Sequence, residues 1–145
     1  MWQPDLVRSL PTGHILREHR EDVRAEIGSG SGMAAGAICY IKGGDTDQIG
    51  HACAMALKNL MGLVCDPVGG LVEVPCVKRN VGGAVNALAA ADMALAGITS
   101  KIPVDQVIDA MKEVGDKMDV SLRETGVGGV AGTPAAQEVV EKLGM

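Results

Sequence analysis

The sequence predicts an all-α fold, a bundle of five to six helices around a loop that is rich in proline and glycine and carries two cysteines. Three observations support this class. Apolar residues repeat at intervals of three and four along most of the chain. Glycine and proline separate these runs. The single β-like stretch, 71–74, is short and lies inside the loop. The 145 residues fit one domain.

Composition excludes several classes of function. A net charge of −5 provides no electrostatic footprint for nucleic acid, and a single Trp, a single Tyr and no Phe leave no stacking platform for single strands. No apolar run is long enough to span a membrane, and the N-terminus lacks the apolar core of a signal peptide. We therefore expect a cytoplasmic protein with no nucleic-acid or membrane partner, whose four cysteines are reduced.

The N-terminal segment, 1–22, differs from the rest of the chain. It is polar and of mixed charge, so we treat it as separate from a helical domain over 23–145. A charged helix is possible over 14–26, and we expect His14 and His19 to lie on a solvated surface rather than in a metal site.

Two helices are expected before the cysteine loop. A glycine- and serine-rich turn over 28–32 leads into an apolar helix over 33–41, which the glycine pair at 43–44 ends. Asp45 and Gln48 then resemble a capping box. They open a helix that runs to about Gly62. Its buried face is predicted to contain the following residues: Ile49, Ala52, Cys53, Ala56, Leu57 and Leu60. His51 is expected on the surface or half-buried.

Further helices follow the cysteine loop. The longest is predicted over 77–96, with Ala84, Leu88, Ala91 and Leu95 in one stripe. Another begins near Pro103, since proline is tolerated in the first turn, and ends at 115. A short helix over 117–124, a flexible loop over 126–132 and a terminal amphipathic helix from 134 complete the chain.

The loop itself is bracketed by Cys65 and Cys76. Pro67 and Pro75 prevent a helix, and the glycine pair at 69–70 permits a tight turn. The spacing of the cysteines fits neither a zinc ribbon nor a thioredoxin motif. Spacing alone leaves two interpretations open: two ligands of a metal cluster, or two buried structural thiols.

The stretch Gly62-Leu-Val-Cys-Asp-Pro-Val-Gly-Gly-Leu-Val-Glu-Val-Pro-Cys-Val-Lys-Arg-Asn80 resembles the cluster-bearing loop of the iron–sulfur-dependent L-serine dehydratase family, in its bacterial α chain. The resemblance continues through 84–97, Lys101-Ile-Pro103 and Arg123-Glu-Thr-Gly126. It is weaker through Ala25-Glu-Ile-Gly28 and 33–44, and it covers about 23–145.

This resemblance implies a [4Fe-4S] cluster that is held by three cysteines and acts as a Lewis acid on L-serine, which is converted to pyruvate and ammonia. Cys65 and Cys76 match two cluster ligands. The third ligand position holds Val23, which cannot bind iron, so the site is incomplete. Cys39 and Cys53 match no ligand and are interpreted as buried small apolar residues. The sequence assigns no catalytic base and no substrate-binding residue.

The departures from the family pattern lead us to expect a truncated chain that lacks the upstream half of the α chain and is inactive alone. The resemblance also implies a β chain or a second α chain as partner. Two alternatives remain: a non-catalytic helical interaction module, and a thiol redox or zinc protein. Truncation would expose small-residue helix faces over 33–42 and 84–96, which are candidates for self-association.

Overall fold

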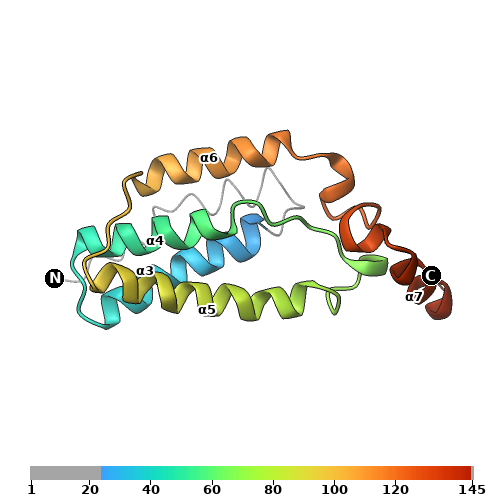
Figure 1. Cartoon of the computed structure of the whole chain (residues 1–145), viewed down its shortest axis with the longest axis horizontal. Helices are drawn as coiled ribbons and strands as arrows, with labels where there is room; N and C mark the ends of the chain where they lie inside the picture. Colours follow the sequence, from blue (N-terminus) through green and yellow to red (C-terminus); the bar gives the residue numbers. More distant parts are fainter. Residues whose placement is uncertain (1–23, 145) are drawn as a thin grey trace.

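A computed structural model describes residues 24–144, whose regular structure is helical (Figure 1). The α-helices are α3 (Ser29–Ile41), α4 (Thr46–Leu60), α5 (Cys76–Leu95), α6 (Val104–Lys117) and α7 (Pro134–Leu143). Within this range there is no strand, only one isolated β-bridge, so the predicted all-α class is confirmed. Most of the predicted helix over 14–26 lies outside the described residues, as do His14 and His19.

Helix α3 begins earlier than predicted. The glycine- and serine-rich stretch over 28–32 is not a turn: a π-helical turn, Arg24–Gly28, runs directly into α3. The small residues of α3 let α4 and α5 approach closely. A Cβ at Gly36 would come within 2.7 Å of the Cys53 sulfur, and the Ser31 hydroxyl donates to the Gly83 carbonyl at 2.8 Å. Packing therefore outweighs the low helix propensity of glycine here.

The end of α3 and the start of α4 match the prediction. The Gly44 N–H donates to the Cys39 carbonyl and the Gly43 N–H to the Tyr40 carbonyl, with φ at +89° for Gly43, as in a Schellman motif. The Asp45 side chain then accepts from the Gln48 N–H at 2.8 Å, and the Gln48 side chain accepts from the Asp45 N–H at 3.0 Å. This reciprocal capping box fixes the first turn of α4.

Helix α4 is the centre of the bundle. Its residues 52–57 are all buried, rather than one face only, because α3 and α5 pack on one side and α6 on the other. Ala54 and Met55 are therefore core residues that the predicted single stripe did not include. At its margin His51 is half-buried, as expected.

Helix α5 packs on α3 and α4 through a face that matches the predicted one only in part, since Ala91 is buried and Leu95 packs against the core. Ala84 and Leu88 are exposed. The buried face consists of Cys76, Gly83, Ala87, Ala90, Ala91 and Ala94. These small side chains, with Ala35 and Cys39 of α3, lie inside the molecule, so most of the small residues predicted for self-association are covered, whereas Ala37, Ala84 and Ala89 are exposed. Close helix approach selects small residues over the larger leucine.

The C-terminal third is less regular than predicted. Helix α6 buries Val107, Ile108 and Met111 against α4 and ends at Lys117, not at Gly115. Only one 3-10 turn, Val120–Leu122, replaces the short helix expected over 117–124, and another, Gly129–Gly132, forms within the predicted loop. Helix α7 lies at the end of the molecule where α5 begins (Figure 1). No helix in the described range is both long and apolar enough to cross a membrane.

Candidate functional site

The cysteine loop connects α4 to α5 and is held by its own backbone. It contains one 3-10 turn, Val68–Gly70, in which φ is +59° at Gly69 and +72° at Gly70, values that glycine adopts without strain. The Val68 N–H donates to the Val74 carbonyl at 2.9 Å and closes the loop. Helix α5 starts at Cys76, so the second cysteine lies in its first turn.

The structure brings the two cysteines into one buried cluster. Cys65 is 2% exposed and Cys76 is 8% exposed, and together with Ile27 they form a small apolar core that is separate from the core of the helix bundle. Leu60 and Leu63 pack against it. Ile27 belongs to the π-helical turn Arg24–Gly28, so the chain that follows position 23 reaches the two cysteines.

Cys65 is positioned by a distant segment of the chain. Its N–H donates to the Leu122 carbonyl at 2.9 Å, and its carbonyl accepts from the Glu124 N–H at 2.7 Å. These bonds form the isolated parallel bridge between Cys65 and Arg123. Arg123 in turn donates to the carbonyls of Met118 and Asp116. The Arg123-Glu-Thr-Gly126 motif thus supports the backbone of Cys65.

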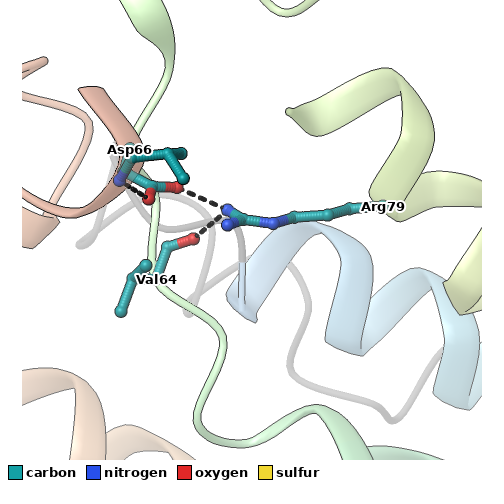
Figure 2. Close-up of polar contacts among 4 residues, drawn as sticks. Val64, Asp66 and Arg79 are labelled. Carbon is teal, nitrogen blue, oxygen red and sulfur yellow. Dashed lines mark hydrogen bonds and ion pairs between the residues drawn. The ribbon is translucent and has the colours of Figure 1, made fainter. Parts of the chain in front are cut away.

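A buried ion pair connects the loop to α5. Asp66 is 2% exposed at its side chain, and its Oδ1 lies 2.6 Å from Nη1 of Arg79. The same Arg79 nitrogen donates to the Val64 carbonyl at 2.7 Å, as Figure 2 shows. The second Asp66 oxygen accepts from the Val130 N–H at 2.6 Å. Both carboxylate oxygens therefore have partners, as a buried charge requires.

This ion pair also brings the two cysteine-bearing segments together. Asp66 follows Cys65 directly, and Arg79 lies three residues after Cys76, on the same side of α5. The contact with Val130 extends the connection to the C-terminal part of the chain. There φ at Gly129 is +62° and a Cβ would overlap the Asp66 carboxylate, so only glycine fits.

Burial raises the pKa of the Cys76 thiol above its ordinary value. The Arg79 guanidinium lowers this pKa, while the carboxylates of Glu26, Asp66 and Glu124 raise it further. Cys76 is therefore protonated at neutral pH. A metal would bind the thiolate, so its binding would release this proton.

The ligand set that the sequence predicts for a metal cluster is not complete in the described range. Within the described range no three His, Cys, Asp or Glu side chains gather at a possible metal position. Position 23, the third family ligand position, holds valine and lies outside the described residues. Any further ligand has to come from elsewhere.

The other two cysteines lie in the helix bundle. Cys39 is fully buried among the alanines of α3, α4 and α5, and Cys53 is buried against Gly36. The expectation that they are buried small residues is confirmed. Desolvation, and secondarily the neighbouring Cys39, raises the pKa of Cys53 from 9.0 to about 11. Cys39, Cys53 and Cys76 are free thiols.

Sequence reasoning missed the Asp66–Arg79 ion pair and the bridge between Cys65 and Arg123. One signal was present: Asp66 lies between two cysteines in an apolar stretch, where an acid needs a buried partner. No pattern in the sequence indicated which base pairs with it, or that Leu122 and Glu124 reach the loop.

Comparison with known proteins places this arrangement in context. The family model described as serine dehydratase alpha chain matches residues 23–131. A protein of Bacillus subtilis named probable L-serine dehydratase, alpha chain, is 62% identical over 120 residues, which are 83% of this chain and 40% of that protein.

Two further relatives carry similar names. The probable L-serine dehydratase, alpha chain, of Latilactobacillus sakei is 62% identical over 111 residues, which are 77% of this chain and 53% of that protein. The L-serine dehydratase, alpha chain, of Peptoniphilus asaccharolyticus is 49% identical over 116 residues, 80% of this chain and 40% of that protein. The chain thus spans about half or less of the length of these relatives.

Proposed function

Because this chain belongs to the serine dehydratase alpha-chain family, we propose that it forms part of an L-serine dehydratase, a lyase that converts L-serine to pyruvate and ammonia. The observation that carries the proposal is the family match over 23–131, together with 62% identity to two proteins named for this activity. The product would enter amino-acid degradation and gluconeogenesis.

The proposed cofactor is a [4Fe-4S] cluster, with Cys65 and Cys76 as two of its ligands. Their burial in one cluster with Ile27 supports this assignment. When bound, such a cluster supplies a Lewis acid that polarises the hydroxyl group of serine. Since the described residues lack a third ligand, the proposal requires one from another part of the enzyme.

The residues around the two thiols have defined tasks in this proposal. Ile27, Leu60 and Leu63 exclude water from the sulfur atoms. The Asp66–Arg79 ion pair and the bonds from Leu122 and Glu124 hold the backbone of Cys65 in place. A buried, apolar setting of this kind limits solvent access to a cluster and tunes its chemistry.

The proposal includes partners and a cellular location. The name alpha chain, which the relatives carry, implies a further chain, so we propose a β chain or a second α chain as partner. A cytoplasmic location fits the free thiols of Cys39, Cys53 and Cys76.

A second candidate is a helical module that has no catalytic role. The observation that favours it is the incomplete ligand set of the described residues. Such a module would fold and bind its partner without iron.

An exchange of segments tests the proposed function against this alternative. The residues of the Bacillus subtilis protein that match this chain after position 23 are replaced by those of the present chain, and the parent's own residue is kept at position 23. We expect this chimera to form pyruvate from L-serine after anaerobic purification, and the isolated chain to form none. A folded chimera without activity, beside an active parent enzyme, would contradict the proposal and favour the helical module.

A further inference from the structure

Helix α5 has two apolar faces, and only one of them is covered. The face of Gly83, Ala87, Ala90 and Ala94 packs on α3 and α4. A second row stays open to solvent although it is made of larger apolar residues. Its members and their exposed fractions are Val77 (54%), Val81 (65%), Val85 (61%) and Leu88 (48%). We call these four residues the valine stripe.

The spacing of the valine stripe suits contact with another helix. Its members follow one another at intervals of four, four and three, so they lie along one side of α5. Scattered exposed apolar residues are ordinary on a protein surface, whereas a contiguous row of them marks an interaction site. In Figure 1, α5 lies along the lower edge of the bundle, away from α6.

The valine stripe begins where the cysteine loop ends. It begins one residue after Cys76, and the loop before α5 exposes three more apolar side chains. These are Leu71 (40%), Val72 (55%) and Val74 (44%). A partner that covers the stripe would therefore also reach these loop residues, on a different face of α5 from the buried Cys76.

We propose that the valine stripe is the surface on which the remainder of a serine dehydratase alpha chain packs. This inference rests on the proposed function. The matched residues are 40% of the Bacillus subtilis and Peptoniphilus asaccharolyticus chains and 53% of the Latilactobacillus sakei chain. In each of these proteins a large unmatched portion is joined covalently to the matched part.

A second copy of this chain is the competing occupant of the stripe. Covalent connection favours the remainder of the alpha chain, because a tethered segment has a far higher effective concentration than a free second molecule.

Cysteine labelling tests the proposal in the full-length chimera described above. Val81→Cys in the stripe is compared with Val120→Cys outside it, since the two valines are 65% and 66% exposed. Each variant is labelled with a maleimide as isolated chain and as chimera. Mass spectrometry then quantifies the peptide that contains the introduced cysteine, so its labelling is distinguished from that of the native cysteines. Circular dichroism confirms that each variant folds.

The expected result is labelling at position 81 that is at least tenfold slower in the chimera than in the isolated chain, with position 120 changed less than about twofold. Equal labelling of position 81 in both proteins overturns the proposal, and so does equal protection of both positions. Protection at position 81 that appears in the isolated chain as its concentration rises assigns the stripe to a second copy instead. The readout requires neither iron nor serine turnover, so its failure is distinct from failure of the proposed function.

Discussion

Asp66 and Arg79 are the residues that connect the cysteine loop to the rest of the chain. The Asp66 carboxylate is buried and accepts from both Arg79 and the Val130 N–H, while the Arg79 side chain is 22% exposed. Removing a charge from such a pair leaves the partner without compensation in a poorly hydrated place. The pair therefore makes the loop sensitive to a change of a single atom.

The first prediction concerns this pair. Asp66→Asn keeps the size of the side chain but removes its charge, and we expect it to lower the free energy of unfolding by about 2–3 kcal/mol. Asp92→Asn is the matched control, because the Lys42–Asp92 pair is equally short at 2.6 Å but exposed. Its expected effect is under about 1 kcal/mol. Urea unfolding measures the free energy of unfolding of both variants. Equal decreases in the two variants would show that the burial of Asp66 is unimportant.

The second prediction concerns Cys53 and pH. Burial raises the pKa of its thiol to about 11 in the folded chain, whereas the unfolded thiol titrates near 9.0. Between these values the unfolded state has lost the proton and the folded state retains it, so the free energy of unfolding falls as the pH rises. Below pH 9 both states are protonated and the effect vanishes.

Between pH 8 and pH 11 we expect the free energy of unfolding of the wild-type chain to fall by about 2 kcal/mol more than that of the Cys53→Ala variant. Urea unfolding at a series of pH values measures this difference, and the comparison of the two chains cancels the pH effects that they share. Parallel pH profiles for both chains would mean that the Cys53 thiol titrates normally.

Among the helices, the close approach of α3 and α4 depends on glycine. A Cβ at Gly36 would come within 2.7 Å of the Cys53 sulfur, whereas a Cβ at Gly30 on the same helix meets nothing within 4 Å. Alanine raises the helix propensity at either position, but only at position 36 does its Cβ meet a neighbouring atom too closely. The two substitutions therefore separate the effect of propensity from the effect of packing.

The third prediction uses this contrast. Gly36→Ala should destabilise the chain by about 1–3 kcal/mol through overpacking. Gly30→Ala should stabilise it by about 0.5–1 kcal/mol, since alanine is the better helix former. Thermal unfolding followed by circular dichroism measures both. If both substitutions stabilise the chain, α3 and α4 are farther apart than described.

The helices show which features the sequence could predict. The cap at Asp45, the end of α3 at Gly43 and the start of α6 after Pro103 depend on nearby residues, and all three were predictable. The start of α3 and the buried face of α5 depend on how closely other helices approach. Local propensity therefore predicted a turn at 28–32 and a buried stripe through Leu88. Tertiary packing instead produces a helix at the first place and an exposed Leu88 at the second.

At the scale of the whole molecule, the candidate site joins parts that are distant in sequence. The loop with Cys65 and Cys76 was recognisable because its motif is continuous. The contribution of Ile27, the bridge to Arg123 and the bond from Val130 were not recognisable, since no periodicity connects such distant segments; Val130 and Asp66, for example, are 64 positions apart. The assignment of Cys65 and Cys76 as metal ligands stays a prediction.

The most direct test of that assignment is the iron content of the chimera after anaerobic purification. Cys65→Ser and Cys76→Ser should each lose most of the iron and the visible charge-transfer absorption, because cluster stability depends on the thiolate ligands. Cys39→Ser and Cys53→Ser are the controls and should retain iron, since both residues lie in the helix bundle. Full iron retention in Cys65→Ser and Cys76→Ser would contradict the account.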